Sequence, residues 1–183
     1  MRVVGGTARG RRLKAPKGRI LRPSSDRVRE AIFDLVGPQG PGELVLDLFA
    51  GTGALAIEAL SRGATGAVLV DKEPRIARLI GQNLASCGFS DKARVVKTDV
   101  LRYLKNASFR QPFDLVLMDP PYGFGLVRKC LELIGEPGWL SERAMVFCET
   151  EKGVSFPERI GCLVLGRVKT YGQTLVHEFF RDD

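Results

Sequence analysis

The residue types best suited to chemistry form one short run, Asp119-Pro120-Pro121-Tyr122, directly after an apolar segment at 113–118. Proline fixes its own φ angle and restricts the residue before it, so the oxygens of Asp119 and Pro120 can be aimed. Two aimed acceptors beside an aromatic ring suit a planar ring that carries an exocyclic amine, because the amine donates hydrogen bonds while the rings stack. The alternative interpretation is an ordinary turn after a strand, since Asp-Pro-Pro is favourable turn chemistry.

A glycine turn, Ala50-Gly51-Thr52-Gly53, follows a second apolar segment at 44–48. Glycine lets the backbone turn tightly and approach a ligand closely, and open α/β sheets bind ligands at the carboxyl ends of their strands. Residues 51–56 also fit the G-x-G-x-x-G/A fingerprint of dinucleotide sites, which makes NAD an alternative ligand. Asp47 argues against NAD, because its charge would repel a pyrophosphate and would suit a sulfonium or an ammonium.

Acidic residues stand at the ends of four expected strands, and they are Asp47, Asp71, Asp99 and Asp119. Because the carboxyl ends of parallel strands share one edge of a sheet, a common site explains the whole set. Asp71, 24 residues after Asp47, can accept both hydroxyls of a ribose, and Asp99 can reach an adenine amine. The alternative is that these acids cap the helices that follow them.

Strands and helices alternate along most of the chain, and this order positions the candidate residues. After a helix at 26–36 and a break at 37–42, we expect strands at 44–48, 67–70, 94–97, 113–118 and 144–148, helices at 54–62, 74–87, 100–105 and 127–134, and a terminal hairpin from 163–169 and 175–180. The pattern predicts an α/β fold with a Rossmann-like, mostly parallel, seven-stranded sheet, a terminal antiparallel hairpin and helices on both faces. We expect two parts, a basic arm with its helix at 1–36 and a main domain at 43–183.

The chain has 183 residues and a net charge of +7, and the positive excess lies at the N-terminus. Residues 1–30 hold ten lysines and arginines against two acids, whereas the remaining residues hold 18 basic and 19 acidic groups. A phosphate backbone is the natural partner of such a block, and a solvated basic tail is the alternative. The arginines that we expect to contact RNA are Arg2, Arg9, Arg11, Arg12, Arg22, Arg27 and Arg29.

The composition is that of an ordinary globular protein, 44% hydrophobic and 27% charged. No apolar run approaches membrane-spanning length and no signal peptide opens the chain, so we expect a cytoplasmic protein without a membrane partner. Cys87, Cys130, Cys148 and Cys162 lack CxxC spacing, which indicates free thiols. Because His177 is the one histidine, we expect no metal site, and we expect His177 itself to be a half-exposed strand residue.

Two stretches resemble a known class of enzymes. Residues 47–53, Asp-Leu-Phe-Ala-Gly-Thr-Gly, resemble motif I of class I S-adenosylmethionine-dependent methyltransferases. Residues 119–122 resemble the [DNS]-P-P-[YFW] motif of those members that methylate amines. Both motifs occur in the expected order, on successive expected strands, so their combination is specific.

The resemblance extends to one family, because four further stretches are similar to the RsmD family, at 1–6, 10–13, 22–31 and 53–64. That family methylates N2 of one guanine in bacterial 16S ribosomal RNA. Two departures keep the functional groups: Asp71 stands where many relatives carry Glu, and Ser24-Ser25 replaces a commoner pair of threonines.

This resemblance implies S-adenosylmethionine as the cofactor and direct in-line transfer of a methyl group from sulfur to nitrogen, without a metal or a covalent intermediate. The cofactor-binding residues that it implies are Asp47, Phe49, Ala50, Gly51, Thr52, Gly53, Asp71, Lys72, Asp99 and Val100. Among them, Asp47 would receive the ammonium, Asp71 the ribose and Asp99 the adenine. The implied catalytic residues are Asp119, Pro120, Pro121 and Tyr122.

Two rivals to a 16S ribosomal RNA (guanine-N2)-methyltransferase stay open. A DNA adenine-N6 methyltransferase uses the same four-residue motif, but it usually carries an added target-recognition region for which 183 residues leave little room. A non-catalytic RNA-binding module would explain the basic arm and leave residues 119–122 without a purpose. Naked 16S RNA and an assembling small subunit are both compatible substrates, and the sequence leaves the oligomeric state open.

Overall fold

The computed structural model describes residues 1–16, 26–121 and 125–182. Three residues to which the sequence assigns roles, Arg22 and the serines Ser24 and Ser25, lie outside the described residues. So does Tyr122, the aromatic residue of the predicted acceptor site.

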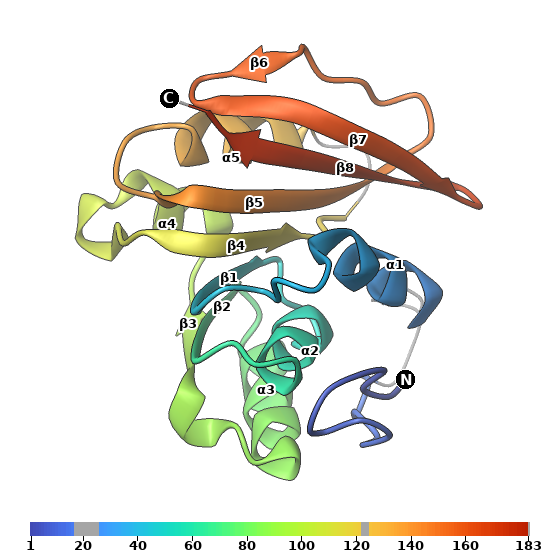
Figure 1. Cartoon of the computed structure of the whole chain (residues 1–183). Coiled ribbons are helices and arrows are strands. Elements are labelled where there is room, and N and C mark those ends of the chain that lie inside the picture. The colour runs from blue at the N-terminus through green and yellow to red at the C-terminus, as the bar shows by residue number, and fades with distance from the viewer. Residues whose placement is uncertain (17–25, 122–124, 183) are drawn as a thin grey trace.

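One sheet runs through the molecule and carries helices on both faces (Figure 1). The helices are α1 (Asp26–Val36), α2 (Ala54–Ser61), α3 (Pro74–Cys87), α4 (Val100–Lys105) and α5 (Leu126–Ile134), with short 3-10 turns η1 (Ser90–Lys92) and η2 (Ala107–Phe109). The strands are β1 (Leu44–Leu48), β2 (Gly66–Asp71), β3 (Ala93–Lys97), β4 (Phe113–Met118), β5 (Leu140–Glu151), β6 (Arg159–Ile160), β7 (Leu163–Tyr171) and β8 (Thr174–Arg181).

The strand order is β3-β2-β1-β4-β5-β8-β7-β6. The first five of these strands pair in parallel, and β8, β7 and β6 continue the sheet with antiparallel pairs. The predicted fold class and terminal hairpin are therefore confirmed. The order reverses at β1, between β2 and β4, which is the position where open α/β sheets bind their ligands.

The sheet has eight strands among the described residues, one more than we predicted. The added strand, β6, is only two residues long and pairs with the start of β7, so it leaves no alternating pattern in the sequence. Strand β5 is also longer than predicted, because its polar first half still pairs with β4 beyond a shift in register, where Phe113 faces Leu140.

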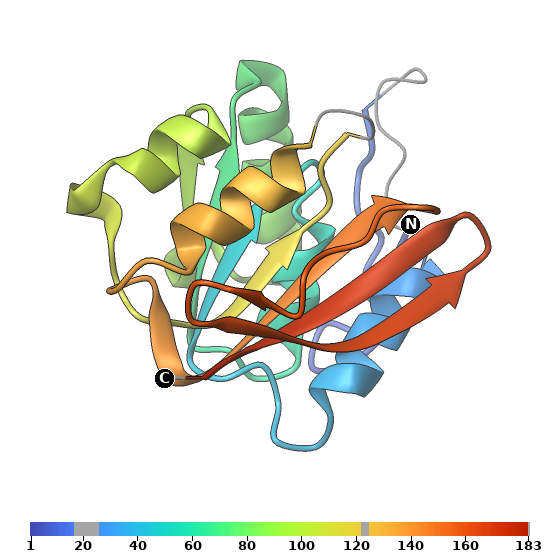
Figure 2. The same ribbon diagram turned by 90° about the horizontal axis from the view of Figure 1, so that it is seen from above.

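Buried side chains form two clusters, one on each face of the sheet. On one face, Val45, Leu117 and Phe147 pack with residues of α1, α2 and α3. On the other face, Leu46 and Val116 pack with residues of α4 and α5. Figure 2, the view from above, shows α5 and α1 on opposite sides of the strands. This arrangement confirms the prediction of helices on both faces.

The N-terminal arm is ordered as a small hairpin over its first 13 residues. Arg2 pairs with Arg12 in an antiparallel bridge, and the N–H of Val3 donates to the carbonyl oxygen of Arg11 at 2.9 Å. Val3 and Leu13 are buried and pack in the same cluster as α1, α2 and α3. The arm therefore shares its core with the sheet.

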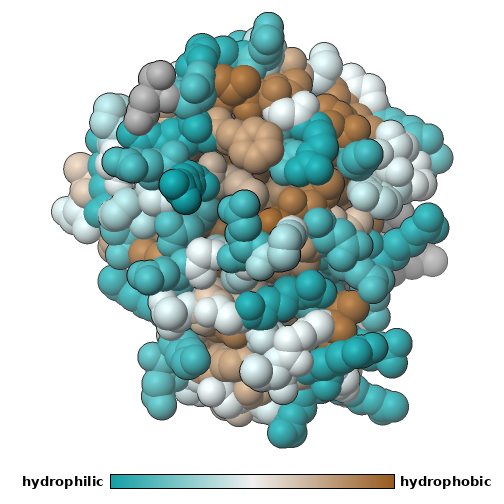
Figure 3. Space-filling view, in the orientation of Figure 1, coloured by the Kyte–Doolittle hydropathy of each residue, from teal (hydrophilic) through white to brown (hydrophobic). Residues whose placement is uncertain are grey.

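Polar side chains cover most of the face seen in Figure 3, and apolar atoms gather over its upper part, where β5, β7 and β8 lie in Figure 1. Val168 of β7 and Phe180 of β8 are the large apolar side chains that are exposed among the described residues. A bilayer-spanning helix, long and apolar enough to cross, is absent from the part of the chain that the structure describes.

Candidate active site

The predicted site residues come together at the carboxyl edge of the sheet. Leu48, the last residue of β1, faces Val70 of β2 on one side and Met118 of β4 on the other. Asp71 and Asp119 follow these two partners directly, so both acids stand level with the start of the glycine turn. The two predicted motifs are therefore adjacent in space, on neighbouring strands.

Two residues of the glycine turn and the residue just before it adopt left-handed backbone angles, with φ of 63° at Phe49, 55° at Gly51 and 76° at Gly53. A Cβ on Gly53 would also lie 3.1 Å from Leu69 and 3.3 Å from Ile80, so the left-handed angle and this crowding both favour glycine. Phe49 carries this conformation with a side chain, which costs roughly 1–3 kcal/mol and is typical of functional sites. The turn is therefore a strained loop and not an ordinary, unstrained turn after a strand.

Asp47 lies beneath the turn and is 1% exposed. Its Oδ2 accepts a hydrogen bond of 3.1 Å from the N–H of Ala56, in the first turn of α2. The pKa of Asp47 is raised to about 8: burial raises it most, the Ala56 N–H opposes this shift, and the nearby carboxylates of Asp119 and Asp71 add smaller increases. A cation beside this carboxyl group would lower its raised pKa, because an opposite charge favours the ionised form.

Asp71 holds the turn from the β2 side. Its Oδ2 accepts from the N–H of Gly51 at 3.1 Å, and its Oδ1 accepts from the N–H of Glu73 at 2.9 Å. Burial raises the pKa of Asp71, while these two N–H donors and the exposed Lys72 oppose the shift. Each carboxylate oxygen has a second lone pair, so Asp71 retains the capacity to accept ligand hydroxyls.

Asp99 follows β3 and caps α4, since its Oδ1 accepts a hydrogen bond of 3.1 Å from the N–H of Arg102. The capping interpretation therefore holds for this acid. Its other oxygen is compatible with the predicted adenine contact, which stays a prediction. The neighbouring Val100 is buried in the core with α5 and supports the start of α4.

The acceptor run leaves the sheet between β1 and β5. Asp119 is half-buried, Pro120 is buried and Pro121 is exposed. Asp119 lies close enough to Asp47 for its charge to raise the pKa of that group. The first two members of the run thus lie beside the glycine turn, while its last member, Tyr122, lies outside the described residues.

Sequence reasoning missed Asn83, a side chain of α3 that is 1% exposed. Its Nδ2 donates to the carbonyl oxygen of Thr52 at 2.9 Å and to that of Lys14 at 3.0 Å, and its Oδ1 accepts from the N–H of Lys14 at 2.8 Å. The signal was available, because an asparagine three residues after Ile80 stands on the apolar face of an amphipathic helix.

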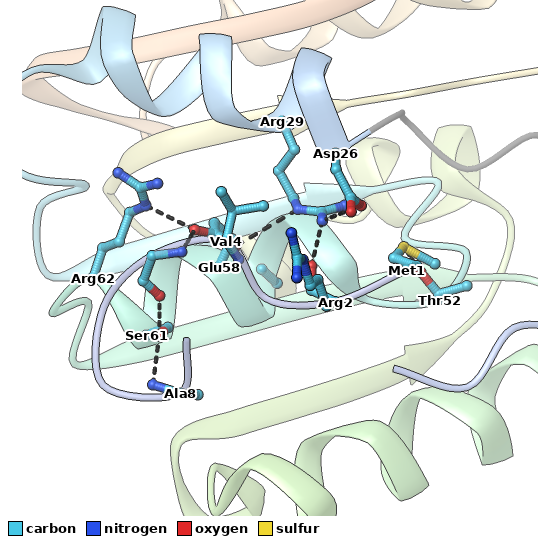
Figure 4. A network of polar contacts seen from close by, with 12 residues as sticks. Met1, Arg2, Val4, Ala8, Asp26, Arg29, Thr52, Glu58, Ser61 and Arg62 are labelled. Atoms are coloured by element: carbon cyan, nitrogen blue, oxygen red, sulfur yellow. Dashed lines mark hydrogen bonds and ion pairs between the residues drawn. The ribbon is translucent and has the colours of Figure 1, made fainter. Parts of the chain in front are cut away.

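The prediction for Arg29 is wrong, because this arginine is fully buried. Its Nη2 donates to Asp26 at 2.8 Å and to the carbonyl oxygen of Arg2 at 2.5 Å, and its Nε lies 3.6 Å from Glu58 (Figure 4). Glu58 is also fully buried and pairs with Arg62 at 2.8 Å. Arg29 therefore binds the arm to the body and is not available to a phosphate.

Five of the arginines assigned to RNA are exposed, and they are Arg2, Arg9, Arg11, Arg12 and Arg27. Four of them belong to the hairpin, which lies against α2 in Figures 1 and 4. Their side chains are thus available to a phosphate backbone, and their contact with RNA stays a prediction.

The expectation that His177 is half-exposed is also wrong, because the ring is buried at 1% exposure. Its Nε2 lies 2.9 Å from the hydroxyl of Thr150, and Phe156 packs edge-on with ring centroids 4.9 Å apart. Burial lowers the pKa of His177, so the ring is neutral near pH 7. The four cysteines are free thiols, and no cluster suited to a metal occurs within residues 1–16, 26–121 and 125–182.

Comparison with known proteins agrees with this geometry. Residues 1–180 match the family described as "Conserved hypothetical protein 95". The chain is 36% identical over 182 residues to "Ribosomal RNA small subunit methyltransferase D" of Escherichia coli strain K12, which covers 100% of this chain and 90% of that relative. The solved structure of yhhF from Escherichia coli matches with a TM-score of 0.86 and 35% identity, over 100% of this chain and 98% of that chain.

A more distant structure shares the fold alone. It is an RNA methyltransferase from Salinibacter ruber in complex with S-adenosyl-L-homocysteine, with a TM-score of 0.68 and 16% identity over 88% of this chain and 95% of that chain. The family match spans nearly the whole sequence, and the alignment with the E. coli relative covers all of this chain. The chain therefore belongs to the RsmD family of class I methyltransferases, the family described as conserved hypothetical protein 95.

Proposed function

We propose that this protein transfers a methyl group from S-adenosylmethionine to the exocyclic N2 of a guanine in 16S ribosomal RNA. One observation carries the proposal: the strained glycine turn after β1 and the Asp119-Pro120 acceptors after β4 lie side by side, with the buried carboxyl of Asp47 beneath them. The name of the E. coli relative, a small-subunit ribosomal RNA methyltransferase, supports the substrate class.

The donor set fits the cofactor. Gly51 and Gly53 let its methionine end approach the backbone, Asp47 favours its positive charges, and Asp71 accepts its ribose hydroxyls. The Salinibacter ruber enzyme, which shares this fold, binds the demethylated product S-adenosyl-L-homocysteine. When bound, S-adenosylmethionine supplies an electrophilic methyl group on a sulfonium.

The acceptor residues prepare the guanine amine for attack. The carboxylate of Asp119 and the carbonyl of Pro120 accept the two N2 hydrogens and orient the amine, whose lone pair is otherwise shared with the ring. As the new nitrogen–carbon bond forms and the sulfur–carbon bond breaks, Asp119 takes the proton that N2 releases. Positioning and oriented electrostatics supply most of the acceleration in such a site.

The exposed arginines of the hairpin supply the RNA affinity, through phosphates that flank the target base. The guanine has to leave its stack to reach Asp119, which costs least in a loop or at an end. Naked 16S RNA and an assembling small subunit are the two candidate substrates, and we place the reaction in the cytoplasm.

Two measurements test the proposal. Calorimetry should detect binding of S-adenosyl-L-homocysteine and none of NAD. Incubation with S-adenosylmethionine and 16S RNA from a strain that lacks this activity should then add one methyl group, located by nuclease digestion and mass spectrometry on N2 of a guanine. Binding of NAD alone, or methylation of DNA adenine in place of RNA, would overturn the proposal.

A further inference from the structure

We propose that Asn83 is a positioning residue that couples the binding of RNA by the arm to the binding of the cofactor by the glycine turn. The inference rests on the proposed function, because it takes the arm as the RNA-binding element and the turn as the cofactor site. It adds a specific link between them, in a residue outside both predicted motifs.

The first observation is the geometry of the Asn83 amide. Its oxygen and one of its N–H groups pair with the N–H and the carbonyl of Lys14, as a neighbouring strand would. Its other donated bond reaches the carbonyl of Thr52, between the two glycines of the turn. One buried amide thus makes three hydrogen bonds that join the end of the hairpin to the cofactor turn.

The second observation is that both ends of the hairpin converge on Thr52. The N–H of Leu13 donates to the carbonyl of Met1 at 3.2 Å, so the two ends lie side by side. The sulfur of Met1 accepts a hydrogen bond from the Thr52 hydroxyl at 3.7 Å (Figure 4). Thr52 is itself buried, so the arm and α3 enclose it.

The rest of the hairpin is fixed along α2, so that it cannot shift without affecting Thr52. The buried carboxylate of Glu58 accepts from the N–H groups of Val4 and Gly5 at 2.8 and 2.7 Å. At the far end of α2, the Ser61 hydroxyl accepts from the N–H of Ala8 at 2.9 Å and donates to the carbonyl of Gly5 at 2.6 Å. The exposed arginines therefore stand on a hairpin that is held at several points along the helix that starts at the cofactor turn.

A thermodynamic consequence follows. A phosphate backbone held by Arg9, Arg11 and Arg12 would restrict the remaining motion of the hairpin and, through Asn83, that of the turn around Thr52. The cofactor then binds a turn that is already ordered, so RNA raises its affinity, and by reciprocity the cofactor raises the affinity for RNA.

The experiment is a binding cycle with S-adenosyl-L-homocysteine and a 16S RNA fragment. In the wild-type protein, saturating RNA should tighten cofactor binding by about fivefold or more, at the lower end of ordinary allosteric coupling. The coupling ratio is the dissociation constant of S-adenosyl-L-homocysteine without RNA divided by that with RNA. In Asn83→Ala this ratio should lie within about twofold of one. Gln82→Ala is the matched control, since Gln82 is exposed and its side chain accepts a hydrogen bond of 3.1 Å from the Lys14 ammonium, without reaching Thr52. This variant should keep the wild-type ratio.

A second measurement needs no variant. Amide hydrogen exchange at Lys14, whose N–H donates to Asn83, should slow when S-adenosyl-L-homocysteine binds the wild-type protein. If both ligands bind the wild type independently and Lys14 exchange is unchanged, the coupling is absent while the proposed function stands. If the wild type binds neither ligand, the proposed function itself fails. An Asn83→Ala protein that folds and keeps the full ratio would overturn the role of this residue.

Discussion

Asp47 and Ala56 are joined by a hydrogen bond of 3.1 Å, from the N–H in the first turn of α2 to a carboxylate that solvent hardly reaches. This bond places a titratable group between the glycine turn and the helix that follows it. Helix N-termini favour negative charge, yet burial dominates here and raises the pKa of Asp47 to about 8. The charge state of the site therefore changes within the physiological pH range.

We expect S-adenosylmethionine to bind more weakly as the pH falls below 8. Its positive charges favour the ionised form of Asp47, so binding below that pH expels a proton, and the dissociation constant should rise by up to about tenfold per pH unit. Calorimetry in two buffers with different ionisation enthalpies measures the released proton. Asp47→Asn, which keeps an oxygen for the Ala56 N–H, should flatten the profile. An unchanged slope in that variant would assign the titration to another group.

The raised pKa of Asp47 also predicts that the stability of the folded protein changes with pH, in the direction opposite to the change in cofactor affinity. Between pH 3.8 and about 8 the folded protein keeps the Asp47 proton that the unfolded chain has lost. The free energy of unfolding should therefore fall across this window as the pH rises, and reach a plateau above it. Urea unfolding at pH 5, 7 and 9 gives the free energy of unfolding of the wild type and of Asp47→Asn. As the pH rises, the wild type should lose stability relative to the variant. A constant difference would contradict the assigned pKa.

Asp119→Ala should lower methyl transfer by roughly 10²-fold or more, taking the loss of one oriented hydrogen-bonding group as the guide. Affinity for S-adenosyl-L-homocysteine should barely change, because the bonds that hold the glycine turn come from Asp71 and Asn83. Single-turnover assays with a 16S fragment measure the rate, and calorimetry measures the affinity. Turnover near the wild-type value would remove Asp119 from the reaction.

Much of the fold was predictable from local pattern. The short apolar runs that became β1, β2 and β4 are buried on both faces, and glycines or prolines bound them, so their type and order were evident. The strand-end acids could be placed on one edge because parallel strands share it. Strand β6 was missed because a strand of only two residues carries no periodicity.

The polar contacts between distant segments could not be predicted from local pattern. Arg29 was assigned to RNA by charge, although its spacing from Ile32, Phe33 and Val36 puts it on the buried face of α1. Glu58 gave a similar signal, since it is the one charged residue in a helix that is otherwise nearly apolar. Pairing these two required the tertiary structure, because 29 residues separate them and each alone is compatible with many partners.

Removing Arg9, Arg11 and Arg12 together should weaken RNA binding and flatten its salt dependence. Each phosphate contact contributes about 0.7 to the slope on single strands and about 0.9 on a duplex, so the loss is roughly two units if all three make contact. The control variant replaces Arg143, Lys152 and Lys169, which are exposed and lie outside the arm. It removes the same amount of positive charge as the arm variant. Filter binding across a salt series distinguishes the two variants. Equal slopes would mean that the arm does not contact the RNA and that the RNA surface lies elsewhere.

The docking of the hairpin depends on Gly6, and this leads to a matched pair of glycine substitutions. Gly6 has a φ of +72°, and a Cβ there would lie 1.8 Å from the backbone oxygen of Ser61, which also accepts the N–H of Thr7 at 2.7 Å. Gly10 has a φ of +85° and meets nothing within 4 Å, so Gly10→Ala introduces backbone strain alone.

Gly6→Ala should therefore displace the hairpin from α2, because a clash between a new side chain and a backbone atom cannot be relieved by a rotamer change. Trypsin cleavage after Arg9, Arg11 and Arg12 under native conditions reports the open population of the hairpin. We expect cleavage to accelerate by about tenfold or more in Gly6→Ala, corresponding to about 1.4 kcal/mol, and by less in Gly10→Ala. Asp71 still holds Gly51, so the Gly6→Ala protein should bind S-adenosyl-L-homocysteine, but more weakly than the wild type, because the displaced hairpin no longer supports Thr52. Equal cleavage rates in the two variants would show that contact with Ser61 does not hold the arm.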